Sequence, residues 1–176
     1  FSYQDWIAKK SKDMGYRVDG PLTVTHFNHD IFKDEGQSRS GSCFFHKKGA
    51  LPNSKKDVIP EGAHDISHVG SRGNPSAFAH AFNKYENFYT YDENSILSIM
   101  AALCGCNSII ASQSHAIDEF HNLRLDCWKY GIAYGIQDLE RAKSNKHLLK
   151  ESLLLQEASD LETVKNFIQF TKEKYN

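Results

Sequence analysis

The stretch YDENSILSIMAALCGCNSIIA (residues 91–111) ends an aromatic strand and begins a helix, with polar side chains at the junction. The first turn of a helix has unpaired backbone N–H groups and the positive end of the helix dipole, which together favour a phosphate. Asp92, Asn94 and Ser95 are equally suited to cap the helix. The stretch has neither the G-x-G-x-x-G fingerprint nor a P-loop lysine, which weighs against a dinucleotide site or an NTPase.

A second candidate site follows the strand predicted over residues 42–47 (SCFFHK), where His46, Lys47 and Lys48 precede Gly49. Lysines beside a glycine turn at the carboxyl edge of a sheet can hold a diphosphate as point charges. A solvated basic turn is the alternative interpretation. The two candidate sites would line one crevice if their strands are neighbours in the sheet.

Nine histidines raise the question of a metal site. Two groups have suitable spacing: His26, His29 and Asp30, and His64, Asp65 and His68. Neither follows the H-E-x-x-H pattern, so we expect no bound metal. A Ser-His-Asp hydrolase is not predicted, because the sequence has no G-x-S-x-G elbow.

The cysteines indicate packing more than chemistry. Cys43, Cys104 and Cys106 lie in or beside apolar stretches, where cysteine behaves as a small hydrophobic residue. The C-G-C spacing is too short for a zinc knuckle and differs from the redox C-x-x-C. Together with Cys127 they predict a reducing, cytoplasmic environment without disulfides.

These candidate sites need a scaffold, and the hydrophobic pattern predicts one of alternating helices and strands. A helix begins at Pro75, a strand covers 88–91 (FYTY), a second helix runs through ILSIMAAL (96–103) and another strand covers 107–111. This alternation is typical of a parallel α/β sheet, and we predict a Rossmann-like fold flanked by helices.

Signals elsewhere are weaker. We predict an amphipathic helix or linker over 3–16, a strand over 22–27, and a loop with Trp128 from 116 to 135. Residues 50–74 are assigned to loops, with a short strand or helix near DVIP and HDISHV. Two long helices are predicted over 136–156 and 160–175, the second begun by a capping box of Ser159 and Glu162.

Composition narrows the class of protein. With 21 Lys+Arg and 22 Asp+Glu in 176 residues, the net charge of −1 excludes nucleic-acid binding through bulk charge. No apolar run approaches the roughly 18 to 20 residues that span a bilayer. We divide one domain into a leading helix and strand (1–40), a core (41–135) and C-terminal helices (136–176). The first residue is Phe1, and we expect a fragment of a larger enzyme.

Residues 39–111, beginning RSGSCFFHKKG, and residues 128–142 (WKYGIAYGIQDLERA) resemble the C-terminal half of GT-B-type glycosyltransferases. The similarity is to bacterial enzymes of polysaccharide or lipopolysaccharide O-antigen assembly. It implies a domain that binds the nucleotide-sugar donor without a metal, while a missing N-terminal domain binds a glycan or lipid-linked acceptor. It also implies a cytoplasmic protein, with peripheral attachment to the inner face of the membrane through the full-length enzyme as an option.

The resemblance also suggests residue roles. It places Lys47 and Lys48 against the donor diphosphate and puts Asn94 and Ser95 at the phosphate-facing helix start. Contacts to the donor sugar fall to Tyr91, Asp92 and Glu93.

Many retaining members of the group carry two glutamates eight positions apart, and here those positions hold Asp92 and Met100. A thioether cannot bind ribose hydroxyls as a carboxylate does, so the ribose contact stays open, with Glu93 as one substitute. No general base is named, because the base is expected in the missing half.

Two other functions remain open. The first is a non-catalytic α/β interaction module with a vestigial nucleotide cleft, of which Met100 would be a symptom. The second is a small metal-dependent enzyme using His64, Asp65 and His68.

Overall fold

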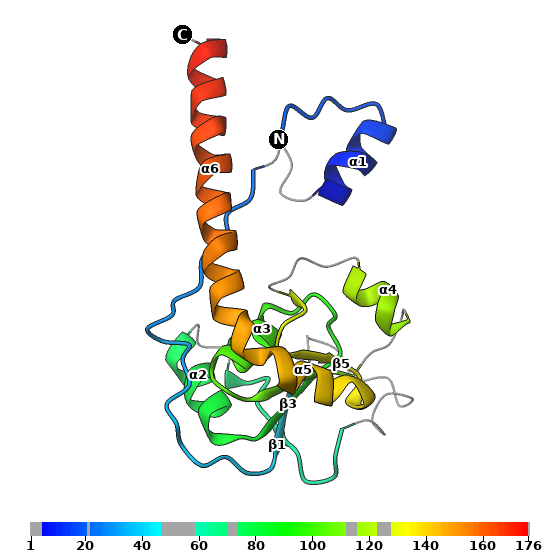
Figure 1. The fold of residues 1–176 in the computed structure, drawn as a ribbon, viewed down its shortest axis with the longest axis vertical. Coiled ribbons are helices and arrows are strands. Elements are labelled where there is room, and N and C mark those ends of the chain that lie inside the picture. The colour runs from blue at the N-terminus through cyan, green and yellow to red at the C-terminus, as the bar shows by residue number, and fades with distance from the viewer. Residues whose placement is uncertain are drawn as a thin grey trace. The chain divides into compact units, whose positions relative to one another are not determined.

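A computed structural model describes residues 5–20, 22–46, 59–69, 74–111, 116–122 and 128–175. The chain divides into two compact units (Figure 1). One comprises residues 28–150, and the other combines residues 1–27 with residues 151–176. Each unit is described by itself.

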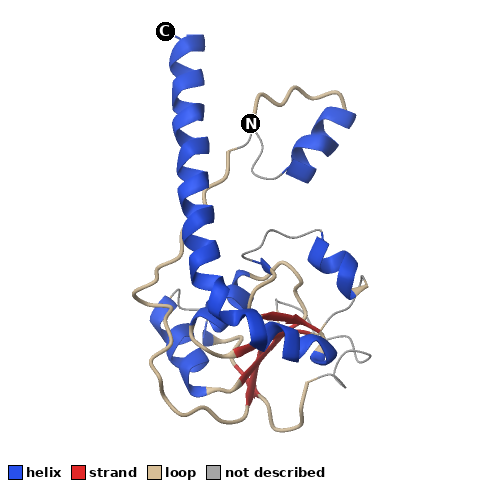
Figure 2. Ribbon diagram, viewed as in Figure 1, coloured by secondary structure: helices blue, strands red, loops and turns tan. Residues whose placement is uncertain are grey.

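The larger unit is built on five parallel strands (Figure 2). They are β1 (Ser42–Phe45), β2 (His64–Asp65), β3 (Asn87–Thr90), β4 (Asn107–Ile110) and β5 (Ile132–Tyr134). Their order in the sheet is β2-β1-β3-β4-β5. This confirms the predicted Rossmann-like α/β sheet, including the strands expected near residues 42–47, 88–91 and 107–111.

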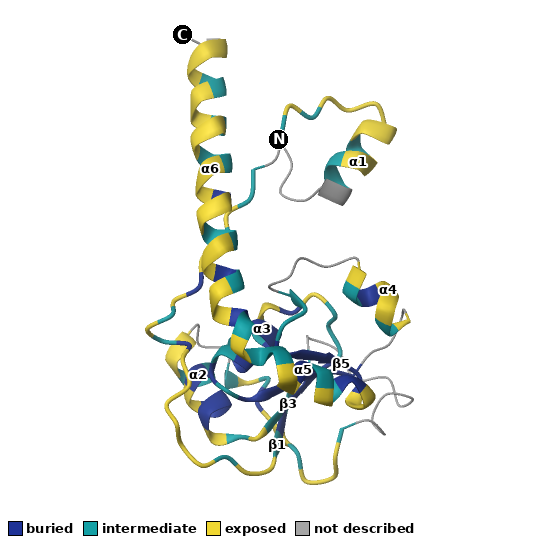
Figure 3. Cartoon of the chain, viewed as in Figure 1, coloured by how far each residue is buried: buried dark blue, intermediate teal, exposed yellow. Residues whose placement is uncertain are grey.

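Helices pack on both faces of this sheet. They include α2 (Pro75–Lys84) and α3 (Ile96–Leu103) on one face and α5 (Leu139–Asn145) on the other. Successive residues of β3 point to opposite faces: Phe88 packs with Phe82 of α2, whereas Tyr89 packs with Ile109 and with Ala142 of α5. The Phe82 and Phe88 rings meet edge to face at 5.0 Å, and burial of each contributes about 1.5–3 kcal/mol. Strands β3, β4 and β5 are almost entirely buried, whereas both residues of the edge strand β2 are exposed (Figure 3).

The predicted helix at Pro75 is confirmed in detail. Pro75 is its first residue, and the side chain of Asn74 accepts a hydrogen bond from the Ser76 amide at 3.1 Å. A proline costs nothing at this position, because its missing N–H would be unpaired in any case. The helix ends at Lys84, three residues before β3 begins.

The loop predicted over 116–135 is partly wrong. It contains α4 (Ile117–Asn122) and β5. The strand has three residues and lies between Gly131 and Gly135, whose φ angles are +72° and +82°. Three residues are too few for hydrophobic periodicity to reveal a strand. Near HDISHV the expected short strand is present as β2. The first two residues of DVIP lie outside the described residues, and Ile59 and Pro60 belong to no strand or helix.

The two long helices predicted at the C-terminus are also wrong in their boundaries. Short 3-10 segments at Ile136–Asp138 (η4) and Lys146–Leu148 (η5) flank α5, and one helix, α6 (Leu149–Tyr175), then continues for 27 residues. No glycine or proline interrupts residues 149–175, so nothing breaks the helix near Ser159. Ser159 and Glu162 are interior helical residues and form no capping box.

The smaller unit contains α1 (Asp5–Asp13), which confirms a helix within 3–16. The strand predicted over 22–27 belongs to no sheet. Instead its amides bond to side chains of α6: Thr23 N–H to Thr163 Oγ1 (3.1 Å), Thr25 N–H to Asp160 Oδ2 (2.8 Å) and Phe27 N–H to Glu157 Oε1 (2.7 Å). Alternate amides of residues 23–27 thus donate to side chains spaced three residues apart along α6. Among the described helices, none is long and apolar enough to cross a bilayer.

Candidate functional site

The candidate site lies where the strand order changes direction. The chain passes from β1 outward to β2 and then returns to place β3 on the other side of β1. Phe45 of β1 is in register with Thr90 of β3, so His46 and Tyr91 follow at the same carboxyl edge. The two candidate sites therefore do belong to neighbouring strands. In open α/β sheets, ligands bind at such a switch point.

The loop from β3 to α3 is ordered by Asp92. Its amide donates to Thr90 Oγ1 (3.2 Å), its carboxylate accepts the Asn94 amide (3.0 Å), and its carbonyl accepts the Ser95 amide (3.2 Å). Ser95 is the N-cap residue and is 7% exposed, but its side chain makes no capping hydrogen bond. The Ser95 side chain thus caps none of the first-turn amides of α3, and of these the Ser98 amide donates to the Ser95 carbonyl (3.0 Å).

Glu93 is held by a residue that the sequence did not single out. The Tyr134 hydroxyl, at the end of β5, donates to Glu93 Oε1 at 2.8 Å. The Tyr134 ring is buried and stacks on Phe120 of α4 with centroids 4.0 Å apart. One carboxylate oxygen of Glu93 is therefore engaged inside the fold. No local signal links positions 41 residues apart.

A buried carboxylate fixes the turn after β5. Asp138 accepts two hydrogen bonds from Arg141 (both 2.7 Å) and one from the Tyr134 amide (2.9 Å), and His121 Nε2 lies 2.9 Å from it. Burial raises the pKa of Asp138, but the hydrogen bonds from Arg141, Tyr134 and His121 outweigh it, and the pKa is lowered. Asp138 thus stays ionised and joins α4, β5 and α5.

The remaining predicted site residues differ in burial, and two of them lie outside the described residues. Lys47 and Lys48 lie outside the described residues. Tyr91 is half-buried beside Asp92, and Asn94 is exposed. Met100 packs against the apolar cluster between α2 and α3, so its thioether serves the core.

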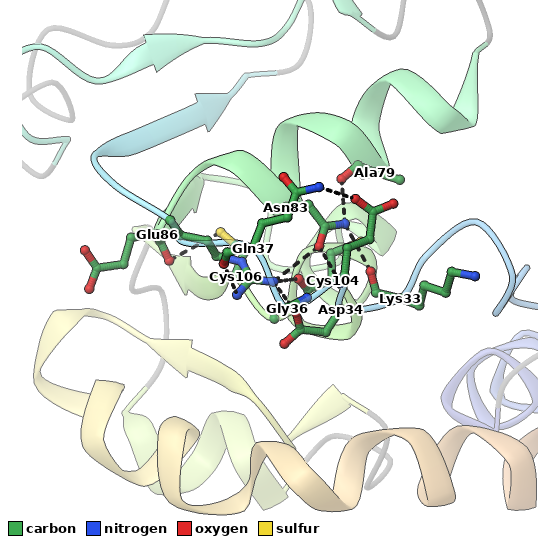
Figure 4. A network of polar contacts seen from close by, with 12 residues as sticks. Lys33, Asp34, Gly36, Gln37, Ala79, Asn83, Glu86, Cys104 and Cys106 are labelled. Carbon is green, nitrogen blue, oxygen red and sulfur yellow. Dashed lines mark hydrogen bonds and ion pairs between the residues drawn. The ribbon is translucent and has the colours of Figure 1, made fainter.

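The C-G-C segment has a structural role at the opposite, amino edge of the sheet (Figure 4). Arg39 Nη2 donates to the Cys104 carbonyl (2.6 Å) and to Asn83 Oδ1 (3.2 Å), and also pairs with Asp34. Lys146 Nζ donates to the carbonyls of Gly105 (3.0 Å) and Cys106 (3.1 Å). Two cations thus neutralise the negative end of α3.

The cysteines confirm the predicted packing role. Cys43, Cys104 and Cys106 are buried free thiols. Burial raises the pKa of Cys104 and of Cys106 to about 12, so both stay protonated near neutral pH. Protonated, buried thiols are poor nucleophiles.

The histidine groups show other contacts. The His64 ring stacks on Tyr85 with centroids 5.8 Å apart and meets His68 at 6.3 Å, while Asp65 accepts the Ser67 amide. His26 lies 3.8 Å from Glu157 of α6. Within the described ranges, no three His, Cys, Asp or Glu side chains gather as a metal would require.

Comparison with known proteins gives no relative: no family model matches the chain, and neither a curated protein nor a solved structure is significantly similar to it. Function is therefore inferred from the carboxyl edge of the sheet and from the resemblance in the sequence.

Proposed function

We propose that this chain is the donor-binding domain of a GT-B-type glycosyltransferase and that it holds a nucleoside diphosphate sugar at the carboxyl edge between β1 and β3. The observation that carries the proposal is the parallel pairing of these strands. It brings His46, at the end of β1, and the loop that leads into α3 to one edge, where the fold class binds its ligands.

The charges of these residues indicate which part of the donor each group would bind. Asp92 and Glu93 repel phosphates, so the diphosphate is assigned to the first-turn amides of α3 and to Lys47 and Lys48. The carboxylates and Tyr91 are assigned to the sugar, because they can accept hydrogen bonds from its hydroxyl groups. Cations and amides at the diphosphate stabilise the charge that grows on it as the glycosidic bond breaks.

The proposal leaves two roles to other groups. Met100 has no atom that binds ribose hydroxyls well, so the ribose is assigned to polar groups elsewhere. The acceptor, a glycan or lipid-linked sugar, and the base that activates it belong to a second domain. The chain alone is expected to bind the donor weakly and to transfer nothing.

Calorimetric titration of the chain with UDP, GDP, ADP and dTDP tests this function. One of the four is expected to bind, and Lys47→Ala or Lys48→Ala should weaken that binding about tenfold, as loss of a hydrogen bond to a charged group does. Lys9→Ala and Lys10→Ala on α1 are matched controls and should leave the affinity unchanged. Unchanged affinity in both Lys47 and Lys48 variants would refute the diphosphate assignment, and turnover by the chain alone would refute the donor-half assignment.

A non-catalytic interaction module is the second candidate, and two contacts favour it. Met100 packs in the core, and Glu93 is engaged by Tyr134, so two side chains at ligand positions serve the fold. Failure of the unaltered chain to bind any of the four nucleotides would decide for the module.

A further inference from the structure

His46 leaves β1 at the candidate site with its ring held from one side. The His46 amide donates to Ser67 Oγ at 3.0 Å, and the same oxygen lies 2.9 Å from His46 Nδ1. The ring also stacks on Phe44 with centroids 5.9 Å apart. Backbone and side chain of His46 are therefore tied to one hydroxyl, just beyond β2.

A carboxylate lies behind the same nitrogen. Asp65 Oδ2 is 3.7 Å from His46 Nδ1, and its other oxygen accepts the Ser67 amide at 2.8 Å. Burial raises the pKa of Asp65, but hydrogen bonds from Ser67 and the nearby charges of His46 and His68 lower it further than burial raises it. Asp65 is therefore ionised near neutral pH.

This arrangement is not a hydrolytic triad. In a triad the serine and the carboxylate bond to different ring nitrogens, whereas Ser67 and Asp65 both approach Nδ1 of His46. Ser67 Oγ accepts the His46 amide, and its own hydrogen can be donated to Asp65 or to Nδ1. When the hydroxyl donates to Nδ1, a neutral ring carries its hydrogen on Nε2, and a charged ring carries one there in either case.

The outward nitrogen is the one that can meet a ligand. No described residue hydrogen-bonds His46 Nε2, and the side chain is 28% exposed. Residues 45 and 90 are in register, so His46 lies at the strand end next to the Asp92 loop. A fixed N–H donor, backed by a carboxylate, is suited to an anionic oxygen.

We infer that His46 is a phosphate-binding residue of the donor site, with Nε2–H donated to a diphosphate oxygen and with Ser67 and Asp65 as positioning residues. This inference rests on the proposed function and adds to it a contact that the lysines do not supply. Lysines act as point charges, whereas a ring held at Nδ1 and stacked on Phe44 offers one direction of approach.

Two substitutions separate the nitrogens of His46. The amide of asparagine reaches about as far as Nδ1, and that of glutamine about as far as Nε2. His46→Asn therefore keeps the Ser67 contact and loses the ligand contact, while His46→Gln keeps the outward donor. His64→Asn is the matched control, because its ring stacks on Tyr85 and faces no strand end of the site.

Calorimetric titration of the full chain with UDP, GDP, ADP and dTDP provides the test, after circular dichroism establishes that each variant is folded. For the nucleotide that binds, His46→Asn should weaken affinity about ten- to a hundredfold. His46→Gln should recover most of the loss, Ser67→Ala should show a smaller one, and His64→Asn none. Equal affinity in His46→Asn and the unaltered chain would overturn this inference alone. No binding by the unaltered chain would overturn the proposed function as well.

Discussion

Replacement of Gly105 by alanine should destabilise the protein more than its backbone angle alone explains. Gly105 has φ +85° and follows the last turn of α3. A Cβ built there would lie 2.6 Å from Arg39 Nη2 and closer still to Asp34 Oδ2. Arg39 cannot simply move aside, because Nη2 also donates to Cys104 and Asn83. The substitution therefore displaces a group that closes the end of the helix.

The magnitude follows from two contributions. A non-glycine residue in the left-handed region costs about 1–2 kcal/mol. Loss of one hydrogen bond from the Arg39 guanidinium adds about 1.5–3 kcal/mol. Gly41→Ala isolates the first contribution, because Gly41 has φ +68° and no atom within 4 Å of its Cβ position. The difference between the two variants should be about 2 kcal/mol, or roughly 4–8 °C in Tm for a chain of this size.

Urea denaturation followed by far-UV circular dichroism measures both variants, with equal m-values required for the comparison. Equal destabilisation of Gly105→Ala and Gly41→Ala would refute the proposed packing of Arg39 and Asp34 over Gly105. A second measurement uses Arg39→Met as the background. There Gly105→Ala should cost little more than Gly41→Ala, because the displaced hydrogen bonds are already absent.

Three further predictions concern acid stability, hydrogen exchange and thiol reactivity. The pKa of Asp138 is lower in the folded than in the unfolded protein. The ionised carboxylate therefore stabilises the fold above about pH 4, and this stabilisation is lost as the pH falls through the folded pKa. Asp138→Asn should reduce the fall of Tm in acid, whereas Asp118→Asn on the α4 surface should not. Amide hydrogen exchange should be slow at Thr23, Thr25 and Phe27, whose amides donate to α6, and fast at the amides between them. Uniform exchange over residues 22–27 would contradict these side-chain contacts. Iodoacetamide near pH 8 should label the three buried thiols only after unfolding, as mass spectrometry can establish for Cys43, Cys104 and Cys106.

Most strands of the sheet could be predicted from the sequence, because helix starts, helix ends and hydrophobic periodicity are set by neighbouring residues. Pro75 begins a helix and Gly105 ends one, and between them the apolar residues change from a helical to an extended period. Failures occurred where the partner of a segment decides its structure. Residues 22–27 have the β-branched composition of a strand, but side chains of α6, not another strand, accept hydrogen bonds from their alternate amides.

The capping box of Ser159 and Glu162 failed for a related reason. A capping motif starts a helix only if the preceding residues have left helical geometry, and nothing before Ser159 does so. Asp160, one residue further on, is buried and accepts the Thr25 amide and a hydrogen bond from Gln156. A distant segment thus uses side chains whose spacing, read locally, indicates a helix start.

In the candidate site too, features set by neighbouring residues could be predicted, whereas contacts between distant residues could not. Asp92 and Ser95 could be placed at a helix start from the sequence, but strand order decides whether His46 lies beside them, and strand order has no local signal. The hydrogen bond between Tyr134 and Glu93, which crosses the end of β4, could not be predicted at all.

The two ends of α3 support the proposed anion site at the carboxyl edge of the sheet. Arg39 donates to the C-cap carbonyl of Cys104 and Lys146 to the next two carbonyls, so two cations lie at the negative end of the dipole within the fold. At the other end the Ser95 side chain forms no capping bond, and the nearby carboxylates of Asp92 and Glu93 are held by an amide and by Tyr134. A chain with a net charge of −1 cannot attract a diphosphate through its overall field. The proposed binding therefore depends on a few fixed donors at this edge, and for that reason a single change at His46 is expected to be measurable.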